Sequence, residues 1–238
     1  MRKAALASIL ILLVASASYA GFLDDLKRGL GIAPAEEGLS DDTVVSGLKE
    51  ALSVASEKAV GAVSRTDGYF ANPDIKILFP EKIRKVGEVL SAVGYQRQVD
   101  DFVLSMNRAA EKAAAGALPI FADAITEMTF EDARGILEGG DTSATEYFKA
   151  KTSERLYESF KPIVSSSMDE VGVTRSYKEM MGRYSAIPLA GGESIDLDHY
   201  VTGKSLDGLF FMLGEEEKKI RTDPAARVTD LLRKVFGG

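Results

Sequence analysis

Residues 99–128 read VDDFVLSMNRAAEKAAAGALPIFADAITEM, and this stretch decides the fold. Its apolar side chains recur at steps of three and four positions as far as Ala113, which places them on one face of a helix and predicts that this face is buried. After Gly116 and Pro119 the same spacing resumes and predicts a second helix. The small residues between 113 and 117 would let the two helices pack closely.

The helical spacing continues on both sides of this pair. We expect helices near residues 40–66, 80–94, 130–138, 142–172, 174–184 and 200–222, and a final helix that starts at Asp223-Pro224. Between 67 and 80 the period is lost, and Asp67-Gly68 and Asn72-Pro73 are turn dipeptides. Alternating apolar residues at 75, 77 and 79 would suit a short strand or an extended arm, and we favour the arm because the chain has no second convincing strand. The predicted fold class is all-α, a single multi-helix globular domain.

The first residues have the pattern of a signal peptide. Arg2 and Lys3 precede a nearly uncharged apolar run, and Ser18-Tyr19-Ala20 ends in small residues that suit cleavage after Ala20. The run is shorter than the ~20 residues that a membrane-spanning helix needs, although an uncleaved anchor remains the alternative. We therefore divide the chain into a signal peptide at 1–20, a short amphipathic helix and linker at 21–39, and the helical domain at 40–238. Residues 21–39 would either dock on that domain or act as a tether.

Composition restricts the compartment and the partners. The chain has no Cys, so it can be neither a lipoprotein nor braced by disulfides, and its stability depends on its core. Its formal net charge is −7, and loss of Arg2 and Lys3 would make the mature chain more acidic still. An acidic chain without a basic cluster does not favour nucleic acid or anionic lipid as a partner. We expect a protein exported to the bacterial periplasm, with no integral span in the mature chain; the oligomeric state stays open.

Several phrases of the sequence carry a family resemblance. They are DGYFANPDIKI at 67–77, SMNRAAE at 105–111, MTFEDARGIL at 128–137, TSERL at 152–156, FKPIV at 160–164, YVTGKSLDGLFFMLGEEEKKIR at 200–221 and DPAAR at 223–227. Together they resemble the bacterial exported family catalogued as domain of unknown function 4197, over about residues 40–236. The resemblance implies a single exported helical domain. It supplies no activity and no catalytic residue.

The candidate ligand-binding residues centre on the phrase SMNRAAE. Glu111 lies four positions after Asn107 and three after Arg108, so the three side chains can touch on one helix face. Arg108 would hold a carboxylate or a phosphate, or it would pair with Glu111 or a neighbouring helix and fix the packing. The other candidates are loop or helix residues that such a pocket could recruit: Asp67, Asn72, Lys204, Asp207 and Arg227.

The sequence gives only weak signals for histidine-based catalysis or for metal binding. His199 is the only histidine, and it lies beside Asp196, Asp198 and Tyr200 without a G-x-S-x-G motif or a Cys. One histidine does not predict zinc, and Asp196-Leu197-Asp198 and Glu215 to Glu217 lack the spacing of a calcium loop. Lys218 and Lys219 follow Glu215 to Glu217, as on a solvated helix face. We predict no cofactor, no metal and no catalytic residue.

Three functional hypotheses remain. The first is a non-enzymatic binding or interaction module of the cell envelope. The second is an envelope hydrolase that uses Arg108, Glu111 and Asp67 or Asp207 on an anionic or glycan substrate. The third is a carrier of an apolar acyl ligand, suggested by the apolar run 210–213, which also fits a helix buried on two sides.

Overall fold

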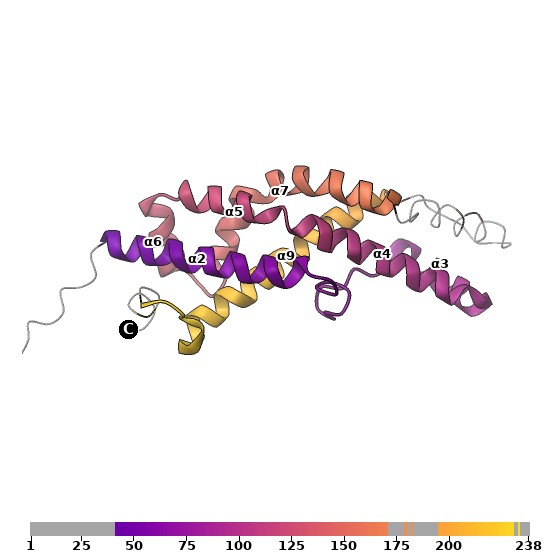
Figure 1. Ribbon diagram of the computed structural model, residues 1–238, viewed down its shortest axis with the longest axis horizontal. Coiled ribbons are helices and arrows are strands. Elements are labelled where there is room, and N and C mark those ends of the chain that lie inside the picture. Colours follow the sequence, from indigo (N-terminus) through magenta and orange to yellow (C-terminus); the bar gives the residue numbers. More distant parts are fainter. Residues whose placement is uncertain (1–40, 171–178, 180–181, 183–194, 231–232, 234–238) are drawn as a thin grey trace, which may run out of the picture. The chain divides into compact units, whose positions relative to one another are not determined.

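The structure is a computed structural model, and it describes residues 41–170, 179, 182, 195–230 and 233. The chain divides into two compact units, Met1–Val44 and Val45–Gly238. Of the first unit, the described residues 41–44 form the first turn of a helix. The second unit is all helices and loops in its described part, with no strand, which confirms the predicted fold class. Figure 1 shows these elements along the chain.

The pair of helices predicted from residues 99–128 is present. Helix α4 spans Gln96–Ala114 and α5 spans Ala117–Thr126, with a sharp turn at Gly116 between them. The predicted stripe of α4 is its buried face: Val99, Phe102, Met106, Asn107, Ala109, Ala110, Glu111, Ala113 and Ala114. A run of alanines on this face leaves room for close helix packing, and α4 packs against both α7 and α9.

Two long helices complete the core. Helix α7 spans Ser143–Glu170 with Pro162 inside it, and α9 spans Leu197–Thr222. They pack against each other, and α7 also packs against α5 and α6. The N-terminus of α9 is capped by Asp196, whose side chain accepts a hydrogen bond from the His199 amide. The buried faces of α4, α7 and α9 therefore form the centre of the molecule.

The N-terminal part of this unit contains an arm and a helical hairpin. Helix α2 spans Asp41–Ser64, and residues 65–80 follow as turns and an irregular extended run, which confirms the predicted arm. Helix α3 spans Glu81–Leu90, and a π-helical turn, η1 at Ser91–Tyr95, leads directly into α4. Gly94 has φ +96° in this turn, a backbone conformation that favours glycine.

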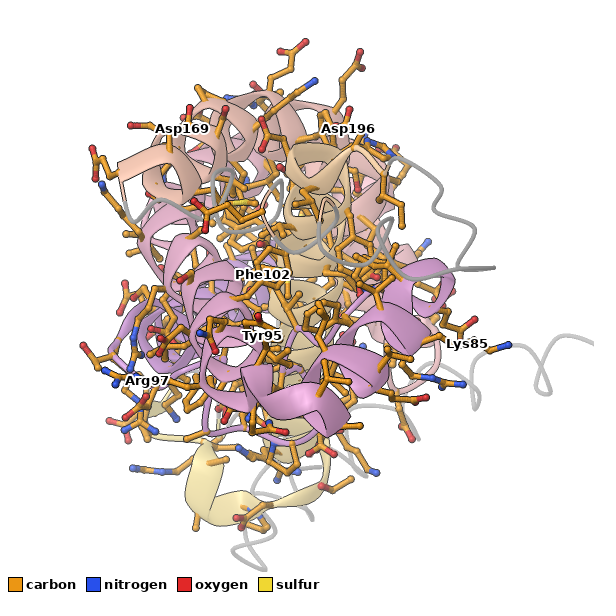
Figure 2. The ribbon with its side chains drawn as sticks, turned by 90° about the vertical axis from the view of Figure 1, so that its right-hand side faces the viewer. Lys85, Tyr95, Arg97, Phe102, Asp169 and Asp196 are labelled. Carbon is orange, nitrogen blue, oxygen red and sulfur yellow. The ribbon has the colours of Figure 1, made fainter. Side chains whose placement is uncertain are left out.

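Figure 2 shows the hairpin from its tip. Phe102 of α4 lies among the helices, whereas Lys85 of α3 and Arg97 of α4 lie on the outside. The ring of Phe102 packs on that of Phe79, with centroids 5.0 Å apart. The end of the arm is thus held in the hairpin by aromatic packing.

Of the two short elements, α6 has the predicted bounds and the one that follows α9 does not. Helix α6 spans Phe130–Glu138 and begins with a capping box, in which Thr129 and Asp132 each bind the other's backbone amide. After α9 the chain makes a single 3-10 turn, η2 at Pro224–Ala226, where we expected a helix to start at Asp223. Proline suits the first position of such a turn as well as that of a helix, so the sequence signal does not separate them.

Three predictions lie largely or wholly outside the described residues. These are the helix at 174–184, the irregular segment that Pro188 and Gly191-Gly192 predict at 185–198, and most of the final helix beyond residue 230. Of 185–198, residues 195 and 196 are irregular as predicted, whereas 197 and 198 already belong to α9. Among the helices that the structure does describe, none has the length and apolar character needed to cross a membrane.

Candidate functional site

Asn107 is buried in α4 and binds the backbone of the arm. Its Oδ1 accepts a hydrogen bond from the Ile77 amide at 2.8 Å. Its Nδ2 donates to the carbonyls of Ile77 and Val103, both at 2.8 Å. Both ends of the side-chain amide are thus occupied by the protein's own backbone. Asn107 fixes the arm on α4 and offers no free group to a ligand.

Glu111 lies one turn further along α4 and binds the start of the arm. Its Oε1 accepts from the backbone amides of Tyr69 at 3.1 Å and Phe70 at 3.2 Å. Its Oε2 accepts from Nη1 of Arg108 at 2.6 Å, and Nη2 of Arg108 donates to Oδ1 of Asp67 at 2.7 Å. The hydrogen bond from Glu111 is the main cause that raises the pKa of Arg108. The guanidinium therefore bridges the two carboxylates and offsets one of their two negative charges.

Asp67 and Gly68 form the tight turn that Arg108 holds. Asp67 has φ +65°, a left-handed conformation that non-glycine residues adopt at a cost but that Asp tolerates better than most. A Cβ at Gly68 would lie 2.5 Å from the carbonyl oxygen of Val63, so glycine is needed there. The ion pair with Arg108 stabilises a turn that the local sequence alone leaves strained.

Tyr69 is the deepest residue of this segment. Its side chain is fully buried, and its hydroxyl donates to the carbonyl of Ser205 in α9 at 2.5 Å. Burial, followed by the charge of Glu111, raises the pKa of Tyr69. Its ring lies against Gly208 of α9. Tyr69 was not among the predicted site residues, and an aromatic residue within a turn-rich segment was the signal that could have singled it out.

The structure brings together four of the eight predicted residues, namely Asp67, Asn107, Arg108 and Glu111. The others have partners elsewhere. Lys204 and Asp207 pair with each other on α9 at 2.8 Å, and this contact raises the pKa of Lys204. Of the two pairings that the sequence left open for Arg108, the structure has the one with Glu111, at 2.6 Å, and its second partner is Asp67 of the arm.

Asn72 and Arg227 also have partners within the protein. Oδ1 of Asn72 accepts from the Asp74 amide at 3.0 Å, and Nδ2 of Asn72 contacts the sulfur of Met212 at 3.5 Å. Arg227 donates to the carbonyls of Ile220 at 3.0 Å and Arg221 at 2.9 Å, which caps the C-terminal end of α9. A ligand-binding role for any of the eight residues stays a prediction.

The surface around the arm contains three adjoining open hollows. A groove of about 560 Å³ lies between α3 and α4, a hollow of about 540 Å³ lies between α3 and α9, and a third of about 350 Å³ lies between the arm and α9. Leu78 lines the first and third, and Glu81 lines the first and second. Leu78 and Phe211, which both line the third hollow, are 58% and 45% exposed. Helix α9 packs against both α4 and α7, which buries Phe210 and Leu213 of the apolar run, whereas Phe211 lies outside this packing.

His199 lies in the hollow between α3 and α9. Its Nδ1 is 2.7 Å from the hydroxyl of Tyr157 on α7, and the two rings are 5.8 Å apart. Asp196, at the upper end of α9 in Figure 2, lines the same hollow. In the described part of the chain no three potential ligand side chains gather to hold a metal ion. The arrangement is a hydrogen-bonded pair at the surface.

A second buried carboxylate was missed from the sequence. Glu217 of α9 accepts from the amides of Ala144 and Thr145 at 2.9 Å each, and from Nη2 of Arg221 at 3.0 Å. It therefore caps the first turn of α7. The solvated face predicted for Glu215 to Glu217 is wrong for Glu216 and Glu217, which are both buried. The place of Glu217 four positions after Leu213 and three before Ile220, both buried, was the available signal.

An apolar hollow lies beside this pair. It is lined by residues of α2, α6, α7 and α9, namely Leu48, Ala51, Leu52, Ala55, Ile136, Ala144, Glu217, Ile220 and Arg221, and its volume is about 20 Å³. That is enough for a water molecule. It is far below the few hundred Å³ of a site for an acyl chain.

The comparisons with known proteins identify the family to which the chain is similar. The family model described as "Protein of unknown function (DUF4197)" matches residues 38–237. No curated protein and no solved structure matches the chain.

Proposed function

The chain belongs to the family described as protein of unknown function DUF4197, and from this premise we propose that it is a non-enzymatic binding module of the bacterial cell envelope. Family membership assigns no activity, so the proposal rests on the chain's own sequence and geometry. Export to the periplasm is supported by Arg2 and Lys3, the apolar run and the small residues before Gly21. Binding is supported by the surface around the arm.

The observation that carries the proposal is the exposure of Leu78 and Phe211 in one hollow. An isolated exposed apolar side chain is ordinary, whereas Leu78 and Phe211 line the same concavity, where an apolar side chain of a partner can pack between them. Asn107 forms two hydrogen bonds with the backbone of Ile77, the residue before Leu78. Leu78 is therefore presented on a backbone that is fixed before any partner arrives, which lowers the entropic cost of binding.

The ion-paired group of Asp67, Arg108 and Glu111 gives less support to a hydrolase than the hollows give to a binding module. A catalytic carboxylate or guanidinium needs a free face toward substrate, whereas both oxygens of Glu111 accept hydrogen bonds from the protein. Arg108 is 35% exposed, but each of its two terminal nitrogens already donates to a carboxylate. Carriage of an acyl chain likewise finds no support in the apolar hollow of about 20 Å³.

Photocrosslinking in the intact periplasm tests the proposal. A photoreactive phenylalanine analogue would replace Leu78 or Phe211, and a matched control would replace Phe130, an exposed aromatic of α6 that lines none of the three hollows. We expect a discrete crosslinked species from positions 78 and 211 and none from 130. Absence of a crosslink at both positions, or the same products at all three, would contradict a binding surface here.

A further inference from the structure

The three hollows form one continuous face, which we call the arm surface. We define it by Asp74, Lys76, Leu78, Glu81, Tyr200 and Phe211. Tyr200, Lys204 and Asp207 line both hollows on α9, so these two hollows adjoin. The hydroxyl of Tyr200 donates to the carbonyl of Leu78 at 3.0 Å and ties α9 to the arm. The apolar and charged groups of this face therefore belong to one rigid surface.

The cations on and around the arm surface already have partners. Lys204 pairs with Asp207 at 2.8 Å, and Arg84 pairs with Glu88 at 3.5 Å. The ammonium of Lys76 lies 4.0 Å above the ring of Phe70. A negatively charged partner would have to compete with these contacts.

Two carboxylates of the same hollows are free. Within the part of the chain that the structure describes, neither Glu81 nor Asp74 forms an ion pair, and both are exposed. Glu81 lines the groove between α3 and α4 and the hollow beside it, whereas Asp74 lines the hollow that contains Leu78 and Phe211. Among the charged side chains that line the three hollows, the acidic ones (Asp74, Glu81, Glu88, Asp196 and Asp207) outnumber the basic ones (Lys76, Arg84 and Lys204), so the net charge of this face is negative, in keeping with the net charge of −7.

We propose that the arm surface binds a polypeptide segment of a partner protein in which apolar side chains stand next to Lys or Arg. The proposal rests on the binding function given above and names the chemistry of the partner. An apolar side chain of the segment packs between Leu78 and Phe211, and its basic neighbours reach Glu81 and Asp74. Charge of opposite sign speeds the encounter and excludes acidic segments, while the apolar contact supplies affinity.

Fluorescence anisotropy with three short labelled peptides tests this chemistry at physiological salt. One peptide alternates Leu with Lys, one alternates Leu with Glu, and one alternates Ser with Lys. We expect the Leu/Lys peptide to bind the mature chain, the Ser/Lys peptide to bind at least about tenfold more weakly, and the Leu/Glu peptide not to bind. Equal binding of the Leu/Glu and Leu/Lys peptides would overturn the proposal, as would no binding of the Leu/Lys peptide.

Substitutions test whether the Leu/Lys peptide binds at the arm surface. Leu78→Ser with Phe211→Ser, and separately Glu81→Lys, are expected to weaken the Leu/Lys peptide by about tenfold or more. Phe130→Ser and Glu154→Lys are the matched controls, because these exposed residues lie outside the three hollows, and they are expected to leave binding unchanged. Thermal unfolding of each variant checks its fold. Equal affinity for control and arm-surface variants would show non-specific attraction to an acidic protein and overturn the proposal.

The two proposals fail in different ways. Crosslinks from positions 78 and 211 without binding of the Leu/Lys peptide would keep the binding function and overturn the partner chemistry. Absence of both the crosslinks and the peptide binding would overturn both proposals.

Discussion

Glu111 is buried with two backbone amides and one guanidinium around its carboxylate. We expect Glu111→Ala to lower the free energy of unfolding by about 3 kcal/mol, because buried donors lose their acceptor and Arg108 loses its closest partner. Urea unfolding measures the change. Lys204→Ala, which removes an exposed ion pair, is the control and should cost at most about 1 kcal/mol. A small effect of Glu111→Ala would instead return Glu111 to the candidates for ligand binding.

The buried phenol of Tyr69 is expected to make the stability of the fold decrease at alkaline pH. The unfolded phenol loses its proton near pH 10, whereas burial keeps it protonated to higher pH in the folded chain. The stabilisation from this group is therefore complete below about pH 10 and decreases as the pH rises above it. Tyr69→Phe should cost about 1 kcal/mol at neutral pH, by loss of the bond to Ser205, and should flatten the fall of stability above pH 10. Denaturant unfolding at neutral pH and at about pH 11 checks both effects. Equal alkaline slopes in the two proteins would contradict this role.

At the scale of elements, the approach of α9 to the arm depends on Gly208. A Cβ at Gly208 would lie 2.5 Å from Cε1 of Tyr69, whose ring cannot move because its hydroxyl and amide are both bound. We expect Gly208→Ala to destabilise the protein by about 1–3 kcal/mol.

Gly203 of the same helix supplies the control, since a Cβ there meets nothing within 4 Å. Gly203→Ala should stabilise the helix by about 0.5–1 kcal/mol. Chemical denaturation of the two variants compares them directly. Stabilisation by both changes would show that α9 can move away from Tyr69.

The elements themselves were largely predictable, and their partners were not. The spacing of apolar residues gave α4, α5 and α6, and the turn dipeptides gave the arm, because these signals act within a few residues. Glu217 shows what such local signals do not specify, namely the distant partner of a buried side chain. Its neighbours in sequence are charged, and its burial follows from the first turn of α7, which lies more than seventy positions earlier in the chain.

At the scale of the whole molecule, the N-terminal division of the chain has a direct test. We expect a chain that begins at Ser40 to unfold in one cooperative transition, at a Tm within about 2 °C of the chain that begins at Gly21. The reason is that Ser40, Asp41 and Asp42 provide a helix start of their own. Differential scanning calorimetry measures both proteins. A clear drop in Tm on removal of residues 21–39 would show that they dock on the domain.

The sequence by itself determined the all-α class, the turn-rich arm and the grouping of Asn107, Arg108 and Glu111 on one helix face, because each depends on periodicity or on contacts within one or two turns. It also carried the phrases that mark the family. Only the tertiary structure decided what that grouping does. The partners of Asn107 and Glu111 are backbone groups of Ile77, Tyr69 and Phe70, about thirty to forty positions away, and no local pattern specifies which distant amide a buried side chain meets. The same holds for Leu78 and Phe211, which become one surface only when the arm is laid against α9.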